Sequence, residues 1–271
     1  MLSASELKVL LNRHGLRLTK RLGQNYLADA GSVARLMDRC QFSPDETVLE
    51  IGAGLGALTE PIAARVKHVV AVEVDRGIAK LLAERLEKFP NVSIRCEDIL
   101  QTDWESLGRV SVVGAIPYHI TSPILIRLSE KRGMIARAIL IMQKEVAERL
   151  LAQPSSKQYG RLTIFIQYGW EIAWSMVLSK NCFFPRPTVD SVCLSLAPCK
   201  QPLLAKDENH FFAVVKAAFA QRRKTLANNL KGFFGEGAVS SALKKMGLDL
   251  SARAETLSVA EFIRLSGLLK R

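Results

Sequence analysis

Five short apolar runs alternate with amphipathic helical patterns over the first 143 residues, and this alternation constrains the fold more than any other feature. The runs are rich in β-branched residues, which is typical of strands buried on both faces of a parallel sheet. They cover residues 47–52, 69–75, 92–98, 110–116 and 137–143. Helical patterns separate them at residues 56–66, 76–88 and 121–131. Strands and helices in alternation predict an α/β fold with a doubly wound, Rossmann-like sheet.

The pattern changes after residue 143. Residues 158–179 and 189–198 are rich in β-branched and aromatic side chains and have the length of longer strands joined by short turns. We therefore expect the sheet to end in antiparallel strands.

The last part of the chain has a helical composition. Residues 208–234 form one amphipathic helical pattern, the Gly-Glu-Gly-Ala segment at 235–238 interrupts it, and two short helical patterns follow. We predict two domains. Residues 1–204 form the first, which begins with a basic helix and loop over residues 1–24, and residues 205–271 form a small helical C-terminal domain.

The charge balance points to a polyanionic partner. The 38 Lys and Arg residues exceed the 26 Asp and Glu residues by 12, which favours binding to nucleic acid or an anionic membrane surface. No apolar run approaches the roughly 18 residues of a membrane span, and the N-terminus lacks the apolar core of a signal peptide. The five cysteines form no CxxC pair, so we expect reduced thiols, a cytoplasmic protein and no metal site.

A glycine loop, Gly52-Ala53-Gly54-Leu55-Gly56, follows the first strand and precedes a helix. Glycines at such a place let the backbone approach a ligand and leave free N–H groups near a helix N-terminus. The spacing differs from the GxGxxG of dinucleotide-binding folds, and no Lys-[Ser/Thr] pair follows as in a P-loop. The loop therefore indicates a nucleoside ligand other than NAD, although taken alone it could also be a tight turn.

Two acidic residues end the following strands. Glu73 lies about 20 residues after Gly52, where a carboxylate can bind ribose hydroxyls. Asp98 ends the third strand, where it can accept a hydrogen bond from an adenine amino group. The alternative, that both are solvated strand-end charges, is weaker beside a glycine loop. A glycine turn with these two acids suits S-adenosylmethionine (SAM).

The fourth strand ends in Gly114-Ala115-Ile116-Pro117-Tyr118. Ligands of open α/β sheets bind beyond the carboxyl ends of the strands, which places this segment beside the expected methyl donor. The Pro-Tyr pair resembles the [DNS]-[PIL]-P-[YF] motif of methyltransferases that act on the amino groups of adenine or cytosine.

Further motifs narrow the resemblance. Residues 20–27 (KRLGQNYL) resemble an N-terminal RxGQNFL motif, with Tyr26 in place of the aromatic Phe. The same family has, in the same order, motifs similar to residues 159–162 (YGRL), 183–191 (FFPRPTVDS) and 219–226 (FAQRRKTL). Over about residues 6–265 the chain resembles the KsgA-type ribosomal RNA adenine dimethyltransferase family.

This resemblance implies an activity and a site. The implied reaction transfers methyl groups from SAM to N6 of two adjacent adenosines in the 3′-terminal hairpin of small-subunit rRNA. The target base is expected to leave its helix and to stack between aromatic rings. The implied catalytic residues are Ala115, Ile116, Pro117, Tyr118 and Phe183. The implied SAM-binding residues are Asn25, Leu27, Gly52, Gly54, Glu73, Asp98 and Ala115.

The resemblance also implies a partner and an RNA-binding surface. The partner is small-subunit rRNA within a late-assembly small ribosomal subunit. We expect the protein to be a monomer and not to bind a membrane. Basic side chains supply salt-dependent contacts to phosphates. The candidates are Arg17, Lys20 and Arg21 before the glycine loop, and Arg222, Arg223 and Lys224, which we expect on a helix.

The chain departs from the family at Ala115, where the family usually has Asn. A methyl group cannot accept a hydrogen bond from the adenine amino group, which leaves the carbonyl of Ile116. By analogy with loss of one oxyanion-hole donor, we expect methylation to be slower by about 10²–10³-fold. Three explanations stay open: natural divergence, an engineered change, or compensation by a group such as His119 or Thr121. Thr188 is a smaller departure, at a position that often carries Lys.

Two other functions remain as alternatives. The first is a large-subunit rRNA adenine methylase of the macrolide-resistance type, which shares the N-terminal motifs. The second is a non-catalytic RNA-binding ribosome-assembly or transcription factor with the same fold, which Ala115 favours. The motif at residues 219–226 favours the small-subunit enzyme over the first alternative.

Overall fold

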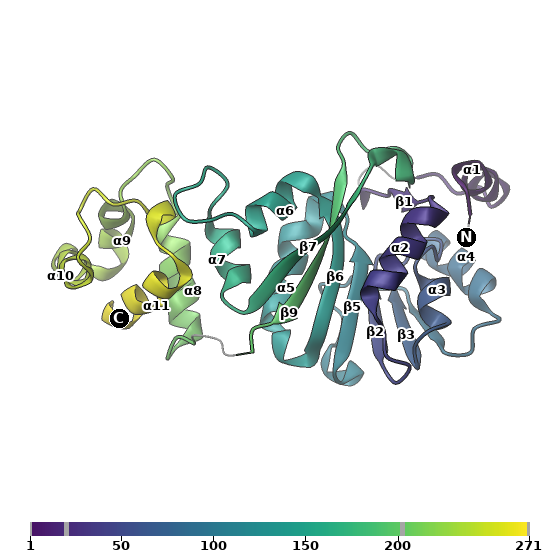
Figure 1. The fold of residues 1–271 in the computed structure, drawn as a ribbon, viewed down its shortest axis with the longest axis horizontal. Helices are drawn as coiled ribbons and strands as arrows, with labels where there is room; N and C mark the ends of the chain where they lie inside the picture. The colour runs from purple at the N-terminus through teal and green to yellow at the C-terminus, as the bar shows by residue number, and fades with distance from the viewer. Residues whose placement is uncertain (1, 19–21, 201–203, 270–271) are drawn as a thin grey trace. The chain divides into compact units, whose positions relative to one another are not determined.

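The computed structural model describes residues 2–18, 22–200 and 204–269. The chain divides into two compact units. Figure 1 shows the ribbon coloured by residue number from the N-terminus to the C-terminus. Unit 1 comprises residues 1–147 and 171–198, and unit 2 comprises residues 148–170 and 199–271. The second unit thus includes residues 148–170, which the sequence analysis assigned to the first domain.

A seven-stranded sheet forms the centre of unit 1 among the described residues, in the order β4-β3-β2-β5-β6-β9-β7. Strands β2 to β6 pair in parallel, whereas β9 pairs antiparallel with β6. The predicted doubly wound sheet with an antiparallel end is confirmed. The strands are β2 (Thr47–Ile51), β3 (His68–Val72), β4 (Val92–Arg95), β5 (Val110–Ala115), β6 (Ile135–Gln143), β7 (Trp170–Leu178) and β9 (Ser191–Pro198).

Helices lie on both faces of this sheet, with α2 in front of it and α5 behind it in Figure 1. Helix α2 was not predicted, although Asp29 caps its N-terminus and its apolar residues recur at helical spacing. The helices of this part of the chain are α1 (Ala4–Arg13), α2 (Ala30–Cys40), α3 (Thr59–Ala63), α4 (Arg76–Leu86), α5 (Thr121–Glu130) and α6 (Lys144–Leu150).

A second, two-stranded sheet joins two segments that are far apart in the sequence. Strand β1 (Tyr26–Leu27) pairs antiparallel with β8 (Phe183–Phe184). Leu27 lies opposite Phe183 in this register, and Tyr26 lies opposite Phe184. The pairing brings the N-terminal motif next to the motif at residues 183–191, which local sequence patterns did not predict.

Unit 2 is helical and has its own core. Phe211, Leu230 and Phe262 are fully buried in one cluster with Tyr159, whose hydroxyl donates to the carbonyl oxygen of Leu257 at 2.8 Å. The chain after residue 205 is helical, as predicted. The helices there are α8 (Glu208–Ala218), α9 (Leu226–Phe234), α10 (Glu236–Met246) and α11 (Val259–Leu268), and they pack with α7 (Arg161–Gln167).

The strand predicted from residue 158 onward is wrong in its first half, because residues 161–167 form helix α7. The hydroxyl of Thr163 donates to the carbonyl oxygen of Arg149 at 2.8 Å. Ile164 is fully buried within the helical core of unit 2. Packing of one helix face therefore overrides the preference of β-branched residues for strands. The second half, from Trp170, is strand β7 as predicted.

The single helix predicted over residues 208–234 is also wrong, because a turn separates α8 from α9. The Thr225 side chain accepts a hydrogen bond from the backbone N–H of Asn228 and caps α9. The Asn229 side-chain amide donates to the carbonyl oxygens of Ala218, the last residue of α8, and of Gln221 in the turn that follows. Arg222, Arg223 and Lys224 thus lie in a turn and not on a helix.

No helix within the described parts of the chain combines the length and the apolar character that crossing a membrane requires.

Gly114 provides a test of the close contact between neighbouring strands. A Cβ atom at Gly114 in β5 would lie 2.6 Å from the carbonyl oxygen of Ile51 and 2.9 Å from its Cβ atom. Gly114→Ala is therefore expected to lower the free energy of unfolding by about 1–3 kcal/mol through overpacking, as measured by urea denaturation. Gly237→Ala is the control, because Gly237 lies in α10 with open space around it. Alanine there is expected to stabilise by up to about 1 kcal/mol, and equal effects of the two changes would contradict this packing argument.

Candidate active site

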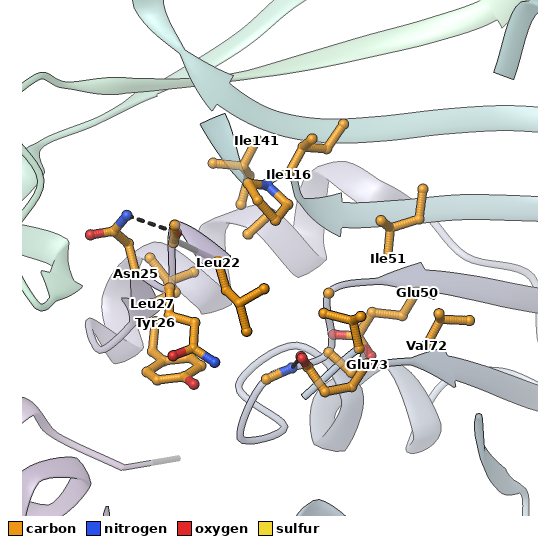
Figure 2. Close-up of a pocket in the computed structure, with 18 of the residues that line it drawn as sticks. Leu22, Asn25, Tyr26, Leu27, Glu50, Ile51, Val72, Glu73, Ile116 and Ile141 are labelled. Atoms are coloured by element: carbon orange, nitrogen blue, oxygen red, sulfur yellow. Dashed lines mark hydrogen bonds between the residues drawn. The ribbon is translucent and has the colours of Figure 1, made fainter. Parts of the chain in front are cut away.

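A pocket in unit 1 lies at the carboxyl ends of β2, β3 and β5 (Figure 2). Figure 2 shows Asn25, Tyr26 and Leu27 on one side of it, and Glu50 and Glu73 on the other. Every residue predicted from the sequence to act in catalysis or to bind SAM lines this pocket. These residues are Asn25, Leu27, Gly52, Gly54, Glu73, Asp98, Ala115, Ile116, Pro117, Tyr118 and Phe183.

The glycine loop forms one wall of the pocket. Gly52, Gly54 and Gly56 have φ angles of 70°, 56° and 86°, in the left-handed region that glycine adopts without strain. The N–H of Gly52 donates to the carbonyl oxygen of Val72 at 3.0 Å, which ties the loop to β3. A Cβ atom at Gly54 would lie 2.8 Å from the Tyr26 ring. The backbone conformation therefore favours glycine at all three positions, and the Tyr26 ring leaves no room for a side chain at Gly54.

Glu73 lies at the end of β3 and is almost completely buried. One carboxylate oxygen accepts from the N–H of Gly54 at 2.9 Å, and the other accepts from the N–H of Asp75 at 3.0 Å. Burial raises the pKa of Glu73, and these backbone hydrogen bonds act in the opposite direction. Since a carboxylate oxygen has two acceptor positions, both oxygens retain capacity for a ligand.

Asp98 lies in the loop after β4 and is half-buried. One of its carboxylate oxygens accepts from the N–H of Leu100 at 2.9 Å, which fixes the side chain in a tight turn. The orientation of this carboxylate at the pocket is therefore set by local backbone geometry.

The charges that line the pocket are mainly acidic and fit a cationic nucleoside better than a phosphate-containing one. Among the described residues that line the pocket, Arg85 is the only Arg or Lys, and its side chain forms an ion pair with Glu60 at 2.6 Å. Acidic side chains repel phosphates and attract sulfonium and ammonium groups. SAM carries both of these cations and no phosphate, so the residues present fit it. The acids that line the pocket are Glu73, Glu97 and Asp98, together with Glu50, whose pKa is raised to about 8 by burial, so that it is mostly neutral.

Glu50 is a pocket residue that the sequence analysis did not single out. It lies on β2 with 1% of its surface exposed, and its Oε2 atom has no hydrogen-bond partner among the described residues. Burial raises the pKa of Glu50 to about 8. The signal in the sequence was a single acid within an otherwise apolar strand, because an unpaired charge is costly to bury.

Tyr118 and Phe183 bring two aromatic rings to the same pocket. The hydroxyls of Tyr118 and Ser191 form a hydrogen bond of 2.8 Å. Ser191 is fully buried at the start of β9, so it fixes the far end of the Tyr118 ring. The N–H of Ile116 donates to the carbonyl oxygen of Ile141 at 2.9 Å, which fixes the preceding backbone. Ser191 belongs to a motif quoted above, but its contact with Tyr118 depends on the folded sheet.

Thr121 and His119 have different surroundings. The Thr121 hydroxyl lies within hydrogen-bond distance of the carbonyl oxygens of Pro117 and Tyr118, at 3.2 and 3.3 Å, and donates within this turn. Thr121 is buried, so its hydroxyl is used in these hydrogen bonds to the backbone. His119 is exposed, lines the pocket and lies against Gly23.

The predicted RNA-binding residues are distributed over both units. Arg17 is exposed after α1, whereas Lys20 and Arg21 lie outside the described residues. Arg222, Arg223 and Lys224 are exposed in the turn between α8 and α9. The Arg222 guanidinium donates to the carbonyl oxygen of Lys157 and pairs with Glu255 at 3.5 Å.

The Rossmann-like sheet, the glycine loop and the acids at the strand ends together define the class of SAM-dependent methyltransferases. The family model of the ribosomal RNA adenine dimethylases matches residues 15–271, and the chain belongs to this family. The family predicted from the sequence is therefore confirmed.

Two curated relatives are similar over almost the whole chain, and both are named Ribosomal RNA small subunit methyltransferase A. The protein of Geobacillus kaustophilus is 42% identical over 276 residues, which cover 97% of this chain and 94% of the relative. A protein of Streptococcus pneumoniae is 40% identical over 277 residues, which cover 97% and 96%.

Solved structures share the fold. A dimethyladenosine transferase from Plasmodium falciparum superposes with a TM-score of 0.77 at 24% identity, covering 88% of this chain and 95% of that one. The 23S rRNA methyltransferase ErmE gives a TM-score of 0.68 at 28% identity, covering 90% and 99%. The predicted fold class is confirmed.

Glu50→Gln tests the buried acid without changing the shape of the side chain. Because the folded state keeps Glu50 protonated up to about pH 8, whereas the ordinary pKa is 4.5, the folded state binds more protons between these values. The free energy of unfolding then falls as pH rises from about 5 to 8, by up to about 1.4 kcal/mol per pH unit. Glu50→Gln is expected to lack this decline in urea denaturation at several pH values. Parallel pH profiles of the two proteins between about pH 5 and 8 would refute the assignment.

Proposed function

We propose that the protein transfers methyl groups from SAM to N6 of two adjacent adenosines in the 3′-terminal hairpin of small-subunit rRNA and forms dimethyladenosine. The observation that carries the proposal is one pocket that unites the SAM-binding candidates with the two aromatic rings expected to hold a base. The names of the relatives at 40–42% identity support the same substrate class.

The SAM side of the pocket binds and orients the donor, which supplies a methyl group bonded to a sulfonium. The Glu73 carboxylate accepts hydrogen bonds from ribose hydroxyls, since both of its oxygens retain acceptor capacity. Asp98 accepts from the adenine amino group. Gly52 and Gly54 allow the backbone to approach the ligand, and Leu27 and Asn25, whose amide donates to the carbonyl oxygen of Gly23 at 3.0 Å, form the opposite wall.

The base side of the pocket orients a weak nucleophile. The lone pair of the adenine amino nitrogen is delocalised into the ring, so its direction must be set by stacking and hydrogen bonding. Tyr118, held by Ser191, and Phe183 stack on the base, while Pro117 and Ala115 shape the opening. The carbonyl oxygen of Ile116 accepts from the amino group. A bound SAM would supply the methyl group that the amino nitrogen accepts, and the methylated amine would release its proton to solvent.

The basic side chains of the protein are the candidates for contacts with RNA. Arg17, Lys20, Arg21, Arg222, Arg223 and Lys224 contact phosphates, which gives affinity without sequence specificity. The specificity arises from the shape of the rRNA hairpin and from the base pocket. The partner is a late-assembly small ribosomal subunit, bound by a monomer in the cytoplasm.

The alternatives have less support. The 23S rRNA methyltransferase ErmE is 28% identical to this chain, compared with 40–42% for the relatives named after the small subunit. The non-catalytic factor is favoured by Ala115, but the relatives that cover almost the whole chain are named methyltransferases.

The function is tested by incubating unmethylated small ribosomal subunits with the protein and SAM, and analysing the rRNA by mass spectrometry. We expect two adjacent adenosines of the 3′-terminal hairpin each to gain two methyl groups. Naked small-subunit rRNA and large-subunit rRNA are the controls and are expected to react more slowly. Preferred methylation of large-subunit rRNA would support the first alternative, and binding of SAM and RNA without transfer would support the second.

Ala115→Asn tests the missing hydrogen-bond acceptor. An Asn carbonyl oxygen can accept from the adenine amino group, so we expect the initial rate to rise by up to about 10²–10³-fold. Ala115→Leu is the matched control, because it adds similar bulk without an acceptor and is expected to give no gain. Equal rates for the chain as it stands and for Ala115→Asn would show that an acceptor at this position is not used.

A further inference from the structure

The base side of the pocket has an apolar wall around Ala115. Ala115 packs against a core cluster that includes Ile141 and Phe183, and all three residues line the pocket. In the pairing of β5 with β6, Ala115 lies opposite Ile141. None of these three side chains contains a hydrogen-bond donor or acceptor. A substrate group that faces this wall is therefore bound best if it is apolar.

A backbone hydrogen-bond acceptor lies next to this wall. The N–H of Ile116 donates to the carbonyl oxygen of Ile141 at 2.9 Å, which fixes the backbone directly after Ala115 (Figure 2). Among the described residues, the hydrogen bonds outside the regular helices and sheets do not use the carbonyl oxygen of Ile116. This oxygen thus keeps its capacity to accept from a base. Thr121 is not among the described residues that line the pocket, so its hydroxyl does not supply a second acceptor there.

The groups on the target nitrogen change during the reaction. Unmodified adenine carries two N–H groups at N6, whereas N6-methyladenine carries one N–H and one methyl group. In each transfer the amino nitrogen uses its lone pair to bond the methyl group of SAM, the sulfur keeps the electrons of its former bond to that carbon, and the nitrogen releases one proton to solvent. The two successive substrates therefore present different groups to the same pocket.

The second of these substrates matches the pocket better than the first. If one N–H of adenine donates to the carbonyl oxygen of Ile116, the other points to Ala115, where the family usually has an Asn acceptor. A buried N–H without a partner is unfavourable. A methyl group in place of this N–H packs on the Ala115 side chain instead, and burial of apolar surface is favourable. The remaining N–H still donates to Ile116.

We propose that Ala115 makes the pocket selective for the monomethylated base, so that the second methyl transfer to an adenosine is faster than the first. The inference rests on the proposed function, because the substrate is the adenine amino group. An acceptor in place of Ala115 removes this preference, since it pairs with the second N–H of adenine and is left unpaired beside an N-methyl group. Ala115 is thus a specificity-determining residue as well as a missing acceptor.

The test measures single-turnover rates on small ribosomal subunits in which one target adenosine is either unmodified or N6-methylated. We expect the unchanged chain to methylate the N6-methylated subunit about tenfold faster. Ala115→Ser adds an acceptor with little bulk, so it is expected to raise the first rate only and to lower the ratio of the second rate to the first about fivefold to tenfold. Partial unfolding of a variant cancels in this ratio. An equal ratio in the two proteins, or a slower second transfer by the unchanged chain, would overturn the proposal.

Two control variants separate the acceptor from other effects. Ala115→Cys is matched to Ala115→Ser, because a thiol is similar in shape to a hydroxyl but is a weak acceptor, and its ratio is expected to stay close to that of the unchanged chain. His119 is the other candidate acceptor, since it lines the pocket with its ring against Gly23. His119→Phe is expected to leave the ratio unchanged. A fall of the first rate alone in this variant would assign the second acceptor to His119 and overturn the proposal.

Binding without reaction gives an independent readout. The same two subunits are titrated with the protein in the presence of S-adenosylhomocysteine, which has no methyl group to transfer. We expect the unchanged chain to bind the N6-methylated subunit about threefold to tenfold more tightly, and Ala115→Ser to lose this preference. Effects of the methyl group on the RNA itself cancel, because both proteins meet the same two subunits. An equal preference in the two proteins would overturn the proposal.

The two proposals fail in different ways. If neither subunit is methylated by the unchanged chain in the presence of SAM, the proposed function fails. If both subunits are methylated at a ratio that Ala115→Ser does not change, only this inference fails.

Discussion

The Glu73 carboxylate is the group on which the rest of the pocket depends. By accepting from the N–H groups of Gly54 and Asp75, it joins the glycine loop after β2 to the start of α4. Asp75 then caps α4 and accepts a hydrogen bond from the side chain of Gln24. Tyr26 packs on the loop at Gly54. One buried carboxylate therefore sets the positions of the loop, a helix N-terminus and the N-terminal segment.

A second set of contacts brings together residues that are far apart in the sequence. The β1–β8 pairing places Leu27 opposite Phe183, and the hydrogen bond between Tyr118 and Ser191 connects the end of β5 to β9. The antiparallel end of the sheet thus contributes to the base side of the pocket as well as to stability. The SAM side depends on the parallel strands, and the base side depends on both parts of the sheet.

The sequence predicted what local patterns encode. The parallel strands, the glycine loop and the acids at Glu73 and Asp98 follow from periodicity and spacing, and the structure places these acids at one pocket. Helix α7 and the turn before α9 were missed because tertiary contacts of Thr163 and Asn229 decide them. The roles of the individual site residues stay predictions.

Each unit is formed by two separate stretches of the chain, and this limits how the protein can be truncated to a single unit. Residues 148–170 belong to the helical unit but precede β7 and β9 of the other unit. Ending the chain near residue 204 would leave the buried side chains of Ile164 and Tyr168 without the helices that cover them. An intact Rossmann-like fragment requires removal of both helical segments and a short connection from β6 to β7. The two units are thus separate in their cores but not separable by a single break.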